Sequence, residues 1–198
     1  MENLLLNLGL SFTLSKLVSY LLFGIFGVLL AFLFVKKSKN RRIALIPKLL
    51  ISIVLVVAPF LIYFAIHPIY VGDFSNNSYS VASKVDFPKK KQLTIIALAN
   101  CPYCIQSIET SKLLIKKNPV IRIEYWLLST DLKDKTKYQK LLGKIVKVKL
   151  KGRTAVELAV LAKGGYPTFV ISEKNQAIKA WNNNSFGVMA MDEICSGF

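Results

Sequence analysis

Two cysteines separated by two residues are the part of this sequence best suited to chemistry. The motif CPYC, residues 101–104, follows an apolar run, 93–99, and opens a helix-like run, 105–117. A cysteine at the start of a helix lies near unpaired backbone N–H groups and the positive end of the helix dipole, which favour thiolate over thiol. Because two intervening residues let the second sulfur reach the first, Cys101 and Cys104 are predicted to open and close a disulfide.

The same spacing also supplies half of a four-ligand zinc site. The sequence offers one further cysteine, Cys195, and one histidine, His67, which stands beside Pro68 in an apolar segment far along the chain from the motif. Since a structural zinc site needs four ligands, we expect no metal at the dithiol. Cys195 follows Met189 and Met191 on an apolar helix face, where a buried inert thiol is favoured over a third redox thiol.

Two apolar runs, 17–35 and 49–66, are each about long enough to cross a bilayer as a helix. The chain of 198 residues is 53% hydrophobic, with a mean hydropathy of +0.44. A buried helical hairpin of a soluble core is the alternative, but a core helix rarely stays apolar on every face for so long. Residues 1–67 are therefore predicted to form a transmembrane hairpin, with Pro59 as a site for a kink.

Charge around this hairpin predicts its orientation. The connecting loop, 36–48, holds six basic residues and no acid, whereas the outer flanks carry little positive charge. Because positively charged loops stay in the cytoplasm, both chain ends are expected to face the periplasm or its equivalent. The sequence thus predicts a protein of the inner (cytoplasmic) membrane with two spans and an external dithiol.

The formal net charge of +16 has simpler explanations than nucleic acid. From Val85 onward there are 19 Lys and Arg against 9 Asp and Glu, and no aromatic residues are interleaved among the lysines as a stacking platform. We expect a solvated basic surface and no nucleic acid partner. Such a surface would still attract acidic partners or anionic lipid headgroups.

A stretch rich in Ser, Asn and Gly, residues 68–85, is predicted to be a linker. Beyond it, strand-like and helix-like patterns alternate and then end in a hairpin, which indicates a mixed sheet with helices on both faces. The predicted strands are 92–98, 120–128, 168–172 and 177–181, and the predicted helices are 104–117, 134–149, 154–163 and 188–195.

The region 86–198 resembles the thioredoxin superfamily, and two motifs carry the resemblance. They are CPYC and Gly164-Gly165-Tyr166-Pro167-Thr168, which stands about sixty residues later, just before the predicted hairpin. The resemblance implies an α/β thioredoxin-like domain, here preceded by a two-helix transmembrane hairpin. It also implies a cis bond at Pro167 that lies against the dithiol, and a Tyr166 backbone that pairs with an extended substrate.

The sequence departs from the familiar thioredoxin pattern next to the dithiol. Asn100 stands where thioredoxin has a tryptophan, and the run 93–99 contains no carboxylate. CPYC is also found in glutaredoxins, but residues 181–185 do not resemble their glycine-rich, acid-containing glutathione turn. The chain more closely resembles extracytoplasmic disulfide oxidoreductases.

The expected mechanism assigns a different role to each motif residue. Cys101 is the attacking thiolate and Cys104 the resolving thiol, while Pro102 and Tyr103 tune the stability of the reduced form. The redox-active disulfide between Cys101 and Cys104 is then the only cofactor expected. The expected partners are extracytoplasmic client proteins with thiols or disulfides, and an unidentified redox partner. The sequence does not fix whether clients are oxidised, reduced or isomerised.

Three alternatives remain open at this point. One is a glutaredoxin-like reductase. Another is a non-catalytic carrier that binds copper(I) through the same two cysteines, because soft thiolates suit that ion. The last is a structural membrane protein in which the dithiol only staples the fold.

Overall fold

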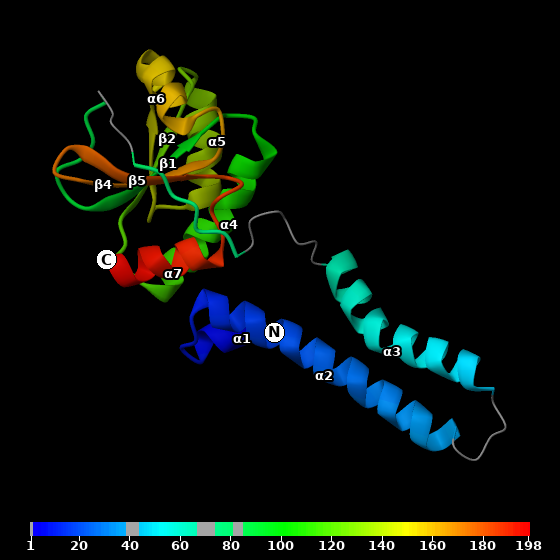
Figure 1. Ribbon diagram of the computed structural model, residues 1–198. Helices are drawn as coiled ribbons and strands as arrows, with labels where there is room; N and C mark the ends of the chain where they lie inside the picture. Colours follow the sequence, from blue (N-terminus) through cyan, green and yellow to red (C-terminus); the bar gives the residue numbers. More distant parts are fainter. Residues whose placement is uncertain (1, 39–43, 67–73, 81–84) are drawn as a thin grey trace. The chain divides into compact units, whose positions relative to one another are not determined.

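The computed structural model describes residues 2–38, 44–66, 74–80 and 85–198, and the chain divides into two compact units. The first unit comprises Met1–Tyr70 and the second Val71–Phe198 (Figure 1). The boundaries predicted from the sequence are a hairpin at 1–67, a linker at 68–85 and a domain at 86–198.

The N-terminal unit consists of three helices, α1 (Glu2–Asn7), α2 (Phe12–Ser38) and α3 (Leu45–Ile66). Helices α2 and α3 contain the predicted spans 17–35 and 49–66, and each has the length and composition of a membrane span. Only 11% of the span window in α2 and 6% of that in α3 is buried, whereas the core helix of a soluble protein would be mostly covered. Pro59 lies inside α3.

Small residues bring α2 and α3 close together. A Cβ atom on Gly27 would lie 2.6 Å from the carbonyl oxygen of Val56, so the backbones approach more closely there than a larger residue allows. Nearer the other end of the pair, the ring of Tyr63 packs edge-on against Tyr20, with 5.5 Å between ring centroids. The hairpin is therefore held by direct helix contacts as well as by its connecting loop.

The C-terminal unit is built on a five-stranded mixed sheet in the order β3-β2-β1-β4-β5. Strands β1, β2 and β3 are parallel to one another. Strand β4 pairs antiparallel with β1, and β5 pairs antiparallel with β4. The strands are β1 (Gln92–Ala97), β2 (Ile123–Leu127), β3 (Lys147–Leu150), β4 (Thr168–Glu173) and β5 (Gln176–Asn182). The helices are α4 (Pro102–Lys117), α5 (Leu132–Leu142), the 3-10 turn η1 (Gly152–Thr154), α6 (Ala155–Ala162) and α7 (Val188–Gly197).

The predicted helix 134–149 is wrong in its second half. Helix α5 ends at Leu142, because Gly143 adopts φ +71°, a conformation that stops a helix at little cost for glycine. Beyond it Val146 and Val148 are buried while Lys147 between them is exposed. This alternation has the period of a strand, and the segment forms β3 at the edge of the sheet.

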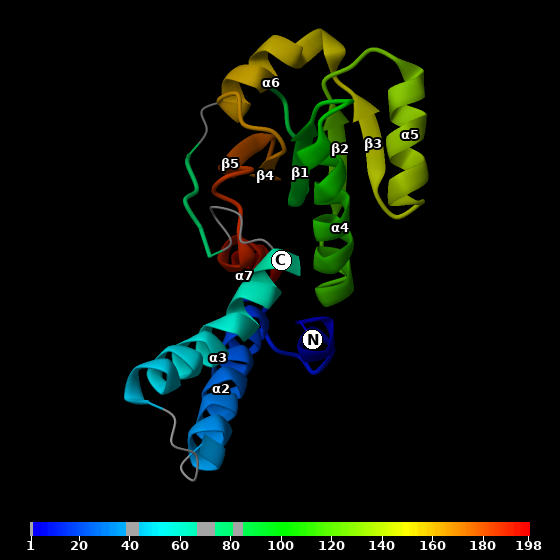
Figure 2. The same ribbon diagram turned by 90° about the vertical axis from the view of Figure 1, so that its right-hand side faces the viewer.

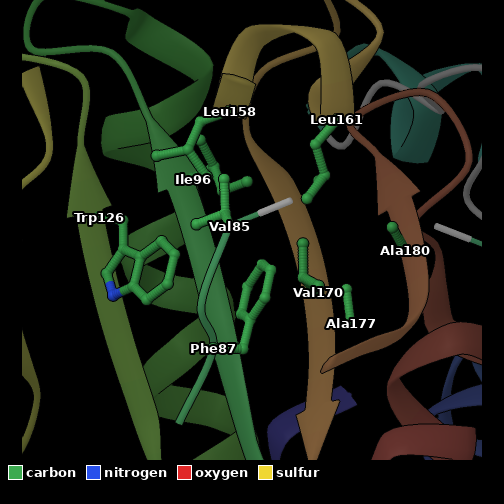
Figure 3. Packing of buried hydrophobic residues seen from close by; sticks show 9 residues of the cluster. All are labelled: Val85, Phe87, Ile96, Trp126, Leu158, Leu161, Val170, Ala177 and Ala180. Carbon is green, nitrogen blue, oxygen red and sulfur yellow. The ribbon is translucent and has the colours of Figure 1, made fainter. Parts of the chain in front are cut away.

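The prediction that helices cover both faces of the sheet is confirmed. On one face, Leu158 and Leu161 of α6 pack into an apolar cluster that surrounds Trp126 and Phe87, whose rings stack with 4.9 Å between centroids (Figure 3). On the other face, the hydroxyls of Ser107 and Ser111 in α4 form hydrogen bonds with the hydroxyl of Tyr125 in β2. Both layers bury the strands that end beside the dithiol.

Residues 74–80 fall within the predicted linker but are attached to the domain. Asn76 forms a bridge to Phe186, and Tyr79 forms one to Ala180 in β5. The Asn76 side chain accepts a 2.8 Å hydrogen bond from Nε1 of Trp181, which is otherwise buried. Tyr79 here pairs with the edge strand β5, and Asn76 with the chain just beyond that strand, which a composition-based linker prediction does not detect.

Candidate dithiol site

The dithiol lies just beyond the carboxyl end of the central strand β1. Cys101 is the N-cap of α4, and its Sγ accepts a hydrogen bond from the backbone N of Cys104 at 3.2 Å. Pro102 occupies the first turn, where its missing N–H removes no helical hydrogen bond. The sequence folds this way because a buried strand is followed directly by a residue type that can cap and a proline that starts the helix.

The two sulfurs occupy different environments. Cys101 is partly exposed, whereas Cys104 is fully buried, and neither is bonded to another cysteine in this structure. Burial raises the pKa of the Cys104 thiol far above its ordinary value, and the hydrogen bond with Cys101 raises it further. Cys104 is therefore held as a thiol behind an accessible Cys101, which suits an attacking and a resolving sulfur.

The raised pKa gives a pH-dependent prediction for Cys104. In a Cys101→Ser variant burial still acts on the remaining thiol, so its thiolate fraction at neutral pH stays small. We expect its alkylation by iodoacetamide to rise about tenfold for each pH unit from 7 to 9 without a plateau. The measurement is peptide mass mapping over time. A plateau at or below pH 8 would contradict a buried, suppressed resolving thiol.

The loop before β4 lies at the same end of the sheet as the dithiol. Thr168, the first residue of β4, is in register with Ile96 of β1, so residues 164–167 stand beside the chain that leads to Cys101. The Tyr166–Pro167 peptide bond is cis, and Pro167 is buried. Burial raises the pKa of Tyr166, and the nearby Cys104 raises it as well.

Two glycines give this loop its shape. Gly164 adopts φ +72°, a left-handed conformation that is strained for other residues. A Cβ atom on Gly165 would lie 2.7 Å from the Cβ of Asn182, so only glycine fits against the end of β5. The hydroxyl of Thr168 then donates to the Gly165 carbonyl at 2.5 Å and closes the turn. The structure thus brings Cys101, Cys104, Tyr166 and Pro167 to one end of the sheet.

The remaining predicted site residues lie at the surface of the same region. Tyr103 follows Pro102 in the first turn of α4, and 53% of its surface is exposed. Its side chain is therefore accessible at the surface next to Cys101.

Sequence reasoning missed two buried tyrosines in the region of the dithiol. The Tyr138 hydroxyl, on α5, donates to the carbonyl of Leu98 at 2.9 Å; burial raises the Tyr138 pKa, and the nearby Cys104 and Cys101 raise it further. Tyr125 bonds Ser107 and Ser111 of α4 at 3.0 and 2.8 Å, and burial raises its pKa to about 12. Both phenols stay neutral and supply a polar, uncharged wall beside Cys104.

Comparisons with known proteins find likeness in structure alone. No family model matches the chain, and no curated protein matches it. A secreted disulfide oxidoreductase of Mycobacterium tuberculosis, homologous to E. coli DsbE, is 13% identical with a TM-score of 0.43; the match covers 56% of this chain and 83% of that one. StoA from Bacillus subtilis is 14% identical with a TM-score of 0.42, covering 60% and 96%.

A further match is the thioredoxin domain of a thiol-disulfide oxidoreductase from Bacteroides vulgatus, 9% identical with a TM-score of 0.40, covering 58% of this chain and 92% of that one. The fold assignment stands on the geometry itself: the mixed strand order, a dithiol that caps the helix after the central strand, and a cis-proline loop before the antiparallel hairpin. The C-terminal unit of this chain is an α/β domain of thioredoxin-like fold.

Proposed function

We propose that this protein is a membrane-tethered thiol-disulfide oxidoreductase that exchanges disulfides with extracytoplasmic proteins. The observation that carries the proposal is the pairing of an accessible Cys101 at the N-terminus of α4 with a fully buried Cys104 behind it. The Cys101 sulfur can contact a client, whereas the buried Cys104 sulfur can react only with Cys101. A dithiol that merely stapled the fold would not need an accessible sulfur at a helix N-terminus.

The exchange proceeds in two substitutions at sulfur. The Cys101 thiolate attacks a client disulfide, forms a mixed disulfide, and releases one client sulfur as a thiolate. Cys104 then gives up its proton and attacks the Cys101 sulfur, which closes the Cys101–Cys104 disulfide and releases the second client thiolate. Two electrons pass to the client, and the proton from Cys104 goes to the departing thiolate. The reverse sequence donates a disulfide.

Residues around the sulfurs orient the client. The backbone at Tyr166 precedes β4 and is proposed to pair with an extended client segment, as the family resemblance implies. Pro102 and Tyr103 lie next to Cys101 in the first turn of α4, where they alter the donors and dipoles around its sulfur. The proposal needs no cofactor beyond the redox-active disulfide, and it includes a separate redox partner that resets the dithiol.

The membrane hairpin is proposed to hold the domain outside the cytoplasm. Helix α2 ends with Lys36 and Lys37, and the connecting loop continues this basic run, so the loop is expected to stay in the cytoplasm. Both termini and the thioredoxin-like domain then face the periplasm or exterior of an inner membrane. Clients and redox partner are sought in that compartment.

Labelling in intact cells tests this topology. In a protein whose three cysteines are replaced by serine, we expect Asn77→Cys to react with a membrane-impermeant maleimide, because residue 77 is exposed on the domain side of the hairpin. Lys36 lies in the last turn of α2, next to the loop that is expected to be cytoplasmic. Lys36→Cys is therefore expected to react only after the cells are permeabilised. Protection of residue 77 in intact cells would reverse the assigned compartment.

An exchange assay separates the proposal from a copper(I) carrier. The full-length protein in detergent is expected to reduce insulin or oxidise a reduced client, in a manner that depends on Cys101. Tight copper(I) binding without either reaction would favour the carrier.

A further inference from the structure

The two ends of the sheet have different chemistry. Strands β1, β2 and β3 are parallel, so their carboxyl ends lead to the dithiol end and their amino ends lie together at the other. Helix α5 runs away from the dithiol end, and its turn into β3 lies at the end of the sheet remote from α6 (Figure 2). We call this amino end of the parallel strands the basal end.

Two neighbouring turns at the basal end carry positive charge. The α4–β2 turn, residues 116–122, contains Lys116 and Arg122, and the α5–β3 turn, residues 140–147, contains Lys140, Lys144 and Lys147. The turns are adjacent because Glu124 in β2 is in register with Lys147 in β3. No acidic residue occurs in the sequence from 110 to 123 or from 135 to 156. Each of these two turns is therefore strongly basic.

Exposed apolar side chains stand at the tips of the same two turns. Ile145 is 77% exposed and Val120 is 69% exposed, and Leu141 beside them is 43% exposed. Most of the surface of Ile145 and Val120 is left outside the core, although their neighbours Val146 and Ile121 are buried in it. Exposed apolar side chains next to lysines are typical of surfaces that insert at the boundary between lipid headgroups and acyl chains.

Under the proposed tethering, the chain between the hairpin and the domain is short. Seven residues separate Ile66, the end of α3, from Phe74, a length that reaches at most roughly 25 Å. The chain joins the domain beside the start of α7, where the Gly187 amide donates to the Ser75 carbonyl at 3.1 Å. In both ribbon views α7 lies at the end of the domain away from α6 (Figures 1 and 2).

We propose that the α4–β2 and α5–β3 turns dock the domain onto anionic phospholipid headgroups of the bilayer that holds the hairpin. Lysines and Arg122 bind the headgroup charge, while Ile145 and Val120 enter the apolar boundary. Docking at the basal end turns the dithiol away from the bilayer, toward soluble clients. This inference rests on the membrane tethering in the proposed function, but not on the thiol chemistry.

Fluorescence quenching by brominated lipids tests the docking in the full-length protein. Both native tryptophans, Trp126 and Trp181, are buried, so an Ile145→Trp variant reports on the turn. In vesicles of phosphatidylcholine and phosphatidylglycerol with brominated acyl chains, we expect the emission that residue 145 adds to that of the wild-type protein to fall severalfold. In brominated phosphatidylcholine alone it should remain bright. Val156→Trp on α6, also an exposed apolar position at 75%, is the matched control and should not be quenched.

Charge removal supplies a second readout. Each Lys adds roughly fivefold to membrane affinity, so the triple change Lys140→Gln, Lys144→Gln and Lys147→Gln should weaken docking about a hundredfold and restore emission. Lys112→Gln, Lys133→Gln and Lys135→Gln remove the same charge from α4 and the first half of α5, and should leave the quenching in place. Exchange activity in solution should be unchanged in both triples.

The opposite results would overturn the proposal. Unquenched Ile145→Trp emission in anionic vesicles would exclude membrane docking and assign the basal end to an acidic protein. Equal quenching of Val156→Trp, or quenching without anionic lipid, would show contact that these turns do not direct. Flotation of the wild-type chain with neutral vesicles checks the anchor separately: failure to float contradicts the tether, and with it the docking, without touching the thiol chemistry.

Discussion

A Cys104→Ser variant is expected to accumulate mixed disulfides with its clients, whereas a Cys101→Ser variant is expected to lose exchange at least about a thousandfold. The difference follows from exposure: Cys101 meets the client, and the buried Cys104 only resolves the intermediate. Without Cys104 the intermediate persists. The measurement is non-reducing electrophoresis of cell extracts, in which trapped adducts disappear on addition of dithiothreitol.

Two further variants make this experiment specific. The double variant with serine at both positions should trap nothing, and Cys195→Ser should behave as wild type, because burial, with Asp192 nearby, raises the Cys195 pKa to about 11. Adducts that form through Cys195, or equal trapping by both single variants, would refute the assigned order of attack.

The largest loss of stability is expected from Trp126→Ala. Trp126 is 1% exposed, stacks on Phe87, and receives the Lys151 ammonium 4.2 Å above its ring (Figure 3). Deleting this ring leaves a cavity between the sheet and α6, at a cost of roughly 3–5 kcal/mol in the free energy of unfolding. Chemical denaturation of the full chain in detergent, followed by circular dichroism, measures the change.

Trp126→Phe is the matched variant, because it keeps an aromatic ring in the same cluster. Its loss should be less than half that of Trp126→Ala. A Trp126→Ala protein as stable as wild type would show that the cluster around α6 does not hold the domain together. In that case the dithiol would be positioned by other contacts than those described here.

Local pattern was enough to predict the elements that carry the dithiol. The apolar run before CPYC becomes the buried strand β1, and Pro102 starts α4, because both signals lie within a few residues of each other. The proline motif was also predictable, since a glycine pair, a proline and a following hairpin form one continuous stretch. The spans at 17–35 and 49–66 rest on length and composition, which need no tertiary information.

Other features depend on contacts between distant residues and could not be predicted in this way. Tyr138 looks like a minor apolar position in a lysine-rich helix, and only the packing of α5 against α4 and β3 brings its hydroxyl to Leu98. The lysines of 144–149 suggest a helix in the sequence. In the structure this segment pairs with β2 and buries Val146 and Val148, so it forms a strand. Val85, at the end of the predicted linker, lies in the core because Phe87 and α6 surround it.

Equilibration of the full-length protein with glutathione buffers over a range of potentials measures whether Cys101 and Cys104 form a redox-active pair. The account predicts one two-electron transition between a dithiol and a Cys101–Cys104 disulfide, located by peptide mass mapping, with Cys195 remaining a thiol throughout. The midpoint also separates a reducing role from an oxidising one. A pair that stays reduced across the whole range, or a disulfide that joins Cys195 instead, would contradict the account.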